Sequence, residues 1–412
     1  MMNYLLTGQK LALLLITGCT LLPPDASSQE SGNMEHLLVT GTYAPLPVSR
    51  LTSSVTLLGF DEIQALNKRT VADVLKTIPG ISVEEQGGPG GLTAVYIRGG
   101  EANFTLVLID GVAMNDPTNT RGGGFDFSNL NLAGVERIEV IRGPQSAMHG
   151  SDALAGVINI ITRRGRQGHQ QIARVEHDEN YTSPVIYPFL AVPPNGAVTR
   201  FERQQTQWVN SVAAGKDSII SAGADYRREQ GTSVGYPDLG FARLPTDFEL
   251  DRKTMALFGD THTKVTPRLL LEASIRYDNP DDFSGETSFN LGAGFDLTPV
   301  FRIKANWGEG FKLPCFFALG HPLLGNSELQ PETAQSWDMN LEWMVDESLS
   351  LTVAYFSNRY DNLIDFDPVL FRLVNREQVK TGGTELQFSW SPLADLDISV
   401  HSTYTDIDST SI

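Results

Sequence analysis

The residue types that most often carry enzyme chemistry do not form recognisable metal or redox spacings in this sequence. A zinc peptidase helix would need His-Glu-x-x-His, and a structural zinc or thiol redox site would need Cys-x-x-Cys; neither occurs. The seven histidines are scattered singly, and the only cysteines are Cys19 and Cys315. The adjacent pair Asp281 and Asp282 follows Pro280, which is more typical of a solvated loop than of a metal site. We therefore expect no enzyme activity, no cofactor and no metal.

Glycine-rich turns are the other candidates for chemistry, because glycine lets the backbone approach a ligand closely. They occur at residues 87–91, 99–100 and 122–124. After Gly88 and Gly90 the third glycine of the dinucleotide-binding pattern is replaced by Thr93, and no Gly-Lys-Ser/Thr occurs. The turns therefore indicate close backbone approach without a nucleotide site.

Charge and the N-terminus limit the class of protein further. The 412 residues carry 31 Lys and Arg against 49 Asp and Glu, a net charge of −18, which argues against a nucleic-acid partner. Lys10 precedes an apolar run at residues 11–22, which predicts a signal peptide over residues 1–28. Cleavage after small residues at 26–28 and lipid attachment to Cys19 are both open. Export is predicted either way.

A polar tail, residues 29–41, follows the predicted cleavage site. It contains one short apolar segment that cannot bury itself locally, made of Glu35, His36, Leu37, Leu38, Val39, Thr40 and Gly41. Such a segment is suited to adding a strand to the sheet edge of a partner. The alternative is that it forms the first strand of the next domain.

Residues 42–168 have the pattern of a small mixed α/β domain. A strand is expected at residues 54–58, and helices are expected after Asp61 and after Thr70, with Pro79-Gly80 ending the second. Short strands then alternate with glycine-rich turns, at residues 81–83, 94–98, 105–109, 137–141 and 157–162.

Several strings in this domain occur in one order and spacing. They are the segments at 37–40, 73–81 (Asp-Val-Leu to Ile-Pro-Gly-Ile), 97–99 (Ile-Arg-Gly), 108–112 (Leu-Ile-Asp-Gly-Val), 137–144 (Arg-Ile-Glu-Val-Ile-Arg-Gly-Pro), 146–147 and 150–162. From residue 35 to residue 165 the chain closely resembles the plug domain of TonB-dependent outer-membrane receptors, nearest the cobalamin transporter branch. By this resemblance the segment 35–41 is the Ton box, on which the periplasmic TonB protein pulls.

Residues 169–412 are predicted to form antiparallel strands, because apolar and polar residues alternate with period two. At residues 271–278 every odd position is apolar or aromatic, and every even one is polar. A soluble sandwich would alternate too. Charges confined to one face, with Trp or Tyr near strand ends, favour a transmembrane β-barrel in contact with outer-membrane lipids. The segments at 308–314, 326–333, 362–366 and 383–386 also resemble the barrel of that family.

The predicted barrel is short for its family. One barrel strand and its share of the connecting loops take roughly 20 residues, so the 244 residues of this region provide only ~12 strands. Plugged transporters have about 22 strands. The fold class is therefore a mixed α/β plug followed by an incomplete, mainly β, antiparallel barrel. The sequence looks internally deleted after Arg166 and truncated at its C-terminus.

The resemblance also implies functional residues. Arg98 and Arg142 lie beside glycines and would pair with the barrel carboxylates of Glu332 and Glu385; the alternative is four unconnected surface charges. Outward-facing plug loops would contact the ligand through Gln86, Leu92, Thr93, Asn115 and Arg121, although ordinary turn chemistry explains any one of them.

Two readings of function remain open at this point. The first is an outer-membrane receptor that takes up a scarce small molecule, cobalamin or an iron chelate, with energy from TonB. The second is a remnant that keeps a TonB-binding plug but does not transport. A surface lipoprotein anchored at Cys19 is a weaker third.

Overall fold

The structure is a computed structural model. It describes residues 37–38, 41–87, 90–163, 175–177, 181–185, 195–237, 242–346, 348–393 and 396–410, all of which belong to one compact unit, His36–Ile412. No helix in these ranges is both long enough and apolar enough to cross a membrane.

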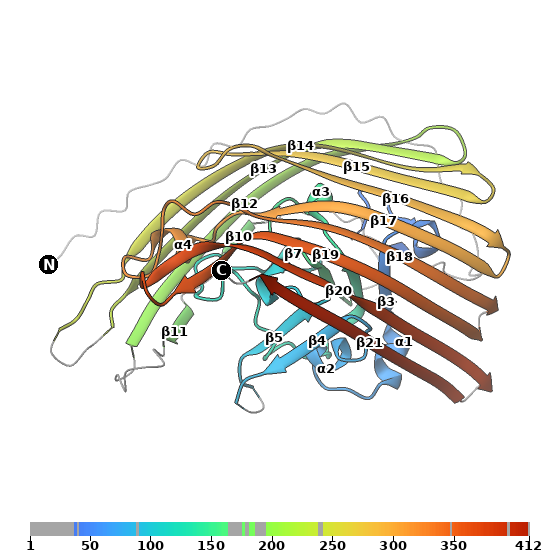
Figure 1. Ribbon diagram of the computed structural model, residues 1–412, viewed down its shortest axis with the longest axis horizontal. Helices are drawn as coiled ribbons and strands as arrows, with labels where there is room; N and C mark the ends of the chain where they lie inside the picture. Colours follow the sequence, from blue (N-terminus) through green and yellow to red (C-terminus); the bar gives the residue numbers. More distant parts are fainter. Residues whose placement is uncertain are drawn as a thin grey trace, which may run out of the picture. The chain divides into compact units, whose positions relative to one another are not determined.

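A small mixed α/β domain, which we call the plug, occupies residues 41–163. Its central sheet has the strand order β3-β8-β9-β6-β7. A separate hairpin joins β4 to β5 (Figure 1). The strands are β2 (Leu46–Pro47), β3 (Ser54–Leu58), β4 (Ile81–Glu85), β5 (Thr93–Ile97), β6 (Thr105–Ile109), β7 (Val112–Ala113), β8 (Val135–Arg142) and β9 (Gly156–Thr162). The helices are η1 (Val48–Arg50), α1 (Phe60–Ala65), α2 (Val71–Leu75), η2 (Ala102–Phe104) and α3 (Ser146–His149). Every strand and helix expected between residues 54 and 162 is therefore present.

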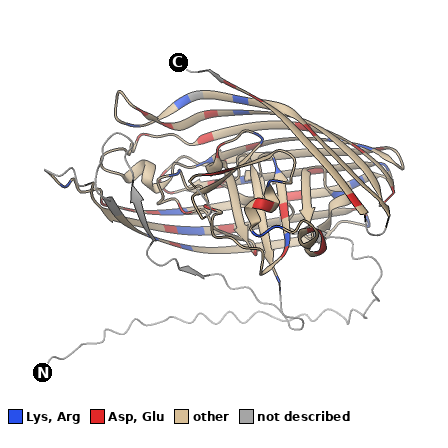
Figure 2. Ribbon diagram, turned by 90° about the horizontal axis from the view of Figure 1, so that it is seen from below, with Lys and Arg blue, Asp and Glu red and all other residues tan. Residues whose placement is uncertain are grey.

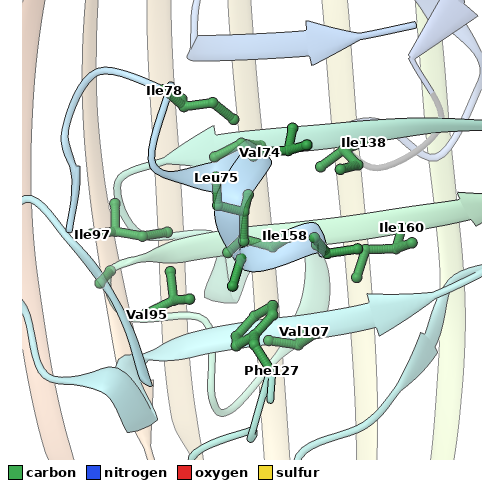
Figure 3. Packing of buried hydrophobic residues seen from close by; sticks show 14 of the residues in the cluster. Val74, Leu75, Ile78, Val95, Ile97, Val107, Phe127, Ile138, Ile158 and Ile160 are labelled. Atoms are coloured by element: carbon green, nitrogen blue, oxygen red, sulfur yellow. The ribbon is translucent and has the colours of Figure 1, made fainter. Parts of the chain in front are cut away.

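Local sequence explains where the second plug helix begins. The Thr70 side chain accepts a hydrogen bond from the Asp73 backbone N–H, which satisfies one of the unpaired donors at the start of α2. Its apolar residues Val74 and Leu75 then pack on the central sheet against Ile138 and Ile158, as Figure 3 shows. Helices α1 and α2, the β4–β5 hairpin and the central sheet all contribute residues to this core.

The remaining strands form one antiparallel sheet of 12 strands, here called the large sheet. Each strand from β12 onward pairs with the next along the chain, while β10 and β11 both pair with β12. The strands are β10 (Val175–His177), β11 (Tyr181–Val185), β12 (Asn195–Ala213), β13 (Ser218–Gly235), β14 (Phe248–Thr266), β15 (Leu269–Pro280), β16 (Glu286–Thr298), β17 (Phe301–Lys312), β18 (Glu332–Asp346), β19 (Leu349–Asp367), β20 (Arg372–Leu393) and β21 (Leu396–Thr410). One helix, α4 (Phe316–Gly320), lies between β17 and β18.

The connections differ in length at the two ends of the large sheet. Two residues join β14 to β15 and β16 to β17, and these turns lie at one end, the turn end. At the other, the loop end, 19 residues (313–331) separate β17 from β18, and 12 (236–247) separate β13 from β14. Outer-membrane barrels have short periplasmic turns and longer extracellular loops, so the same asymmetry orients this sheet.

In the large sheet charged side chains are buried and apolar side chains are exposed, which is the reverse of a soluble protein. On β15 the charged residues Arg276 and Asp278 are 2% and 1% exposed, whereas the apolar neighbours Ile275 and Tyr277 are 48% and 46% exposed. The charged face packs on the plug, and the apolar face has no cover from described residues. Such a face is stable against lipid, in agreement with the prediction of a lipid-facing sheet.

The expectation that this outer face carries no charge is wrong near the loop end. Outward-facing residues there form ion pairs, Arg228 with Asp251 at 2.8 Å and Arg359 with Asp361 at 2.9 Å. Figure 2 shows charges of both signs on the strands of the sheet. A membrane-crossing strand needs only about 9–11 residues. The strands that carry these pairs have 18 or 19 residues, so their ends extend beyond the apolar belt and tolerate charge.

The large sheet does not close into a barrel. Among the described residues, β21 pairs only with β20, and no pairing joins it to β10, β11 or β12 at the opposite edge. This agrees with the expected shortage of strands.

Candidate functional site

The inner face of the large sheet holds the plug through buried charge, and the first of these contacts centres on Arg98. Its guanidinium donates from Nε to Glu385 Oε1 at 2.8 Å and from Nη2 to Glu385 Oε2 at 3.1 Å. Nη1 lies 3.7 Å from Asp338 Oδ2, and the ring of Phe356 lies 4.7 Å from the guanidinium carbon. All these partners belong to strands β18, β19 and β20, so one plug side chain connects to three strands of the sheet.

Arg142, at the end of β8, completes this cluster. Its Nε lies 3.5 Å from Glu385 Oε2, and its Nη1 donates to Thr56 Oγ1 at 2.9 Å and to the Pro79 carbonyl at 3.1 Å. Ser54 Oγ accepts from both arginines. Two guanidinium groups therefore face two carboxylates, Asp338 and Glu385, and the buried cluster is close to neutral.

The plug backbone is shaped to let Glu385 reach the arginines. A Cβ atom at Gly80 would lie 2.1 Å from Glu385 Oε1, and Gly80 has φ +77°, a conformation that suits glycine. Arg98 itself has φ +51°, its N–H donates to the Gly80 carbonyl at 2.7 Å, and its carbonyl accepts from Thr381 Oγ1 at 2.9 Å. The turn and the ion pair therefore depend on each other.

Burial and charge act in opposite directions on these arginines. Burial lowers the pKa of Arg98, but the nearby carboxylates, Glu385 first, outweigh it and raise the pKa above its usual value. For Arg142 burial prevails, and its pKa is lowered despite Glu385. Arginine stays protonated in proteins, so both side chains are cations that need a carboxylate partner in a dry interface.

Glu332 does not join this cluster. No ion pair between described residues connects it to Arg98 or Arg142; its Oε1 accepts from the Ile364 backbone N–H at 2.9 Å. The position at the start of β18, beside the loop end, places it next to Lys312 on β17 instead. The expected pairing of Glu332 with a plug arginine is therefore absent, and Asp338 takes the second carboxylate position.

A second contact joins the plug to β17. Lys312 Nζ lies 2.5 Å from Asp152 Oδ1, and Ser151 Oγ accepts from the Leu313 N–H at 3.1 Å. Helix α3 packs against β15, β16 and β17 (Figure 1). Burial would raise the pKa of Asp152, but Lys312 more than compensates and the pKa falls to about 2.

A third contact holds the start of the plug near the turn end. Thr52 donates to Glu272 through its N–H at 2.9 Å and its hydroxyl at 2.5 Å. His262 lies between Glu272 and Asp260, with its two ring nitrogens 3.3 Å and 2.9 Å from their carboxylates. Plug segments from residue 52 to residue 152 are thus fixed at separate points along the wall.

The five expected ligand contacts fall into two groups. Thr93 and Asn115 are buried, and their side chains bond to the plug backbone: Thr93 Oγ1 donates to Gly91, and Asn115 bonds to Thr105, Val107 and Gly123. Gln86 is exposed, while Leu92 and Arg121 are half-buried, and Arg121 lies 3.8 Å from Asp126. Gln86 is therefore the exposed member of the five, and Leu92 and Arg121 are partly accessible.

The predicted partner-binding segment is only partly described. Leu37–Leu38 form β1, which pairs antiparallel with β2. Gly41 lies in a bend, while Glu35, His36, Val39 and Thr40 lie outside the described residues, as do Cys19 and the predicted signal peptide. Among the described residues, no three His, Cys, Asp or Glu side chains are grouped as metal ligands.

One hydrolase-like string does occur, Gly-Thr-Ser-Val-Gly at residues 231–235. A nucleophile elbow requires a sharp turn from a strand into a helix. Residues 231–235 instead lie inside the uninterrupted strand β13. The string therefore provides no serine nucleophile.

Comparison with known protein families decides the class of protein. The chain matches the family model for the TonB dependent receptor-like β-barrel over residues 110–411, and that for the TonB-dependent receptor plug domain over residues 47–157. The chain belongs to the TonB-dependent receptor family. The large sheet is accordingly a receptor barrel wall, and the protein is an outer-membrane protein.

Two relatives of this receptor are vitamin B12 transporters. It is 25% identical to the vitamin B12 transporter BtuB of Vibrio vulnificus over 473 residues, which cover 86% of this chain and 75% of the relative, and 22% identical to BtuB of Vibrio cholerae (87% and 76%). An aligned span of 473 residues exceeds the 412 of this receptor. The relatives therefore contain segments within that span that are missing here.

Solved structures show the same fold. The ferripyoverdine receptor of Pseudomonas aeruginosa superposes with a TM-score of 0.70 at 13% identity, over 90% of this receptor and 73% of that chain. The siderophore receptor PirA of the same organism gives a TM-score of 0.57 at 18% identity, over 86% and 84%.

The sequence did not single out several residues of the receptor's plug–barrel interface, chiefly Asp338, Asp152, Lys312 and Glu272. The three that belong to the barrel are polar residues that face inward from strands in which polar and apolar residues alternate. This alternation was the only feature of the sequence that could have indicated them. It identifies the face of a residue but not its partner.

Proposed function

We propose that this receptor takes up a scarce small molecule of the cobalamin or iron-siderophore type across the outer membrane, using energy delivered by TonB. The cluster of Arg98 and Arg142 with Glu385 carries the proposal. It holds the plug by charged hydrogen bonds, whose net contribution to stability is reduced by the desolvation of the charges, so the interface stays polar enough to rearrange under a pulling force. The named relatives that transport vitamin B12 or bind siderophores support this ligand class.

The proposed sequence of events begins at the loop end. A ligand would contact the exposed Gln86 and the half-buried Leu92 and Arg121 of the plug. TonB would then bind the segment 35–41 by strand addition, displacing the pairing of β1 with β2, and pull on the plug. In this scheme residues 1–28 are the signal peptide, 29–41 the periplasmic tail, 42–168 the plug and 169–412 the partial barrel.

Uptake in cells without their own cobalamin and siderophore receptors tests the proposal. Cells expressing the full chain should accumulate radiolabelled cyanocobalamin or a ferric siderophore only when TonB is present. Val39→Pro should abolish uptake, because proline removes a backbone donor from the added strand. Val39→Thr keeps that donor and serves as the matched control. The proposal would be contradicted if the Val39→Pro variant took up as much ligand as the wild type. It would also be contradicted if cells without TonB took up as much as cells with TonB.

The open edge of the large sheet favours a second candidate, a remnant that retains a TonB-binding plug but does not transport. Heat-modifiability separates the two. A closed barrel resists detergent until boiled and migrates differently in cold and boiled samples. An outer-membrane band that shifts on boiling would support the transporter, whereas no shift, with rapid periplasmic degradation, would support the remnant.

A further inference from the structure

A basic cavity lies at the turn end of the barrel wall, far from the ligand-facing loops. Its volume is about 120 Å³, and it is lined by the plug segment Ser49, Arg50 and Leu51 and by residues of β14 to β17. Five of the lining residues are basic and one, Asp296, is acidic. This excess of positive charge differs from the cluster of Arg98 and Arg142, which face two carboxylates.

The five cations differ in whether they have a partner. Arg302 pairs with Asp296 and donates to the Ser49 carbonyl at 2.8 Å, and Lys304 lies 2.7 Å from Glu342. Arg50, Lys264 and Arg268, by contrast, make no side-chain hydrogen bond or ion pair with any described residue. Arg50 is half-buried, while Lys264 and Arg268 are exposed at the rim. Three unpaired cations from two parts of the chain therefore share one cavity.

This arrangement suits a multiply charged oxyanion. Arginine offers a planar fork of N–H donors that matches phosphate geometry, and lysine adds a compact point charge. Cations that share a partly enclosed cavity strengthen the local field, since part of the surrounding water is replaced by protein. Arg302 and Lys304 already have carboxylate partners. The positive charges of the other three basic residues therefore remain to be compensated.

We propose that this cavity is a binding site for a phosphate group, held by Arg50, Lys264 and Arg268. Because Arg50 belongs to the plug and the other two to the barrel, a bound phosphate would join the two domains at the periplasmic end. The proposal does not depend on which molecule the receptor transports. The group could come from free phosphate or from an anionic lipid headgroup, and the experiment distinguishes these sources.

The test is calorimetric titration of the full chain, folded in a zwitterionic detergent, with inorganic phosphate at low salt. The wild type should bind saturably, and Lys264→Gln with Arg268→Gln should weaken binding about tenfold or more, as expected for lost charged hydrogen bonds. The control combines Arg228→Gln with Lys253→Gln. It also removes two positive charges, but from the outer face near the loop end, and should leave binding unchanged. Asp296→Asn removes the competing carboxylate and should tighten binding, which a misfolded protein would not do.

Reconstitution identifies the source. If an anionic headgroup fills the site, phosphate binding should be lost in vesicles of phosphatidylcholine with phosphatidylglycerol and kept in phosphatidylcholine alone. If free phosphate is the ligand, both vesicles should give equal binding. No saturable binding in any setting, equal binding by the double variant, or weaker binding by Asp296→Asn would overturn the proposal.

Discussion

Arg98 and Glu385 are 287 residues apart in sequence, yet the guanidinium of one and the carboxylate of the other form two hydrogen bonds of 2.8 and 3.1 Å inside the plug–barrel interface. Because Glu385 also lies 3.5 Å from Arg142, its single negative charge serves two buried cations. We therefore expect the interface to be sensitive to this one side chain.

Glu385→Gln should weaken the interface strongly. It would leave Arg98 with only Asp338 and Arg142 with no carboxylate, and uncompensated buried charge costs about 3–5 kcal/mol. Chemical denaturation of the detergent-solubilised chain, followed by tryptophan fluorescence, should show this loss. Glu309→Gln, on the outer face of β17 with one bond from Gln335, should change stability little. Equal effects of the two variants would mean that the arginine cluster contributes no special stability.

Gly80→Ala should displace Glu385 from the arginines. The added methyl would lie 2.1 Å from Glu385 Oε1, and alanine would also be strained at φ +77°. Gly87→Ala is the matched control, since Gly87 has φ +93° and, its chain neighbours apart, no atom of the described residues lies within 4 Å of an added Cβ. Gly87→Ala should cost about 1 kcal/mol of backbone strain, and Gly80→Ala distinctly more. A Gly80→Ala variant no less stable than Gly87→Ala would argue against the close approach.

Acid should loosen the plug at Asp152. Its pKa in the folded protein is about 2, below the ordinary value of 3.8, so its pair with Lys312 contributes stability above about pH 4 that is lost as the pH falls toward 2. The contribution is about 2 kcal/mol, from roughly 1.4 kcal/mol per pKa unit. Unfolding measured from pH 6 to pH 2 should show this slope. It should be smaller in Asp152→Asn, in which asparagine tolerates the φ of +85°. An unchanged slope would assign the acid effect to other carboxylates.

Leu257→Arg should impair insertion into lipid. Leu257 is 65% exposed on the outer face of β14, and an arginine near the bilayer midplane costs about 2–4 kcal/mol. Folding into lipid vesicles, measured by protease resistance, should decrease. Gln230→Arg introduces the same residue on the outer face of β13, among the charges near the loop end, and should fold normally. Normal folding of Leu257→Arg would mean that this face does not contact lipid.

The sequence alone determined the elements and their faces. The capping pattern at Thr70 predicted the start of α2, and period-two alternation on β15 predicted which side chains face lipid. Both follow from local rules, because capping acts over three residues and a strand alternates its faces at every step. The ordered strings from Asp73 to Thr162 were also sufficient to predict the plug.

Only the tertiary structure decided which inward charges meet. Glu385 and Glu332 look alike in sequence, as acidic residues in barrel strands, yet only Glu385 reaches Arg98. The choice depends on strand register and on the close approach that Gly80 allows, which arise from contacts hundreds of residues apart. Asn115 shows the same limit: it looked like a ligand contact in a loop, but the folded chain directs its amide to three backbone groups of the plug. A linear pattern specifies the face of a side chain, whereas its partner is determined by how the whole chain packs.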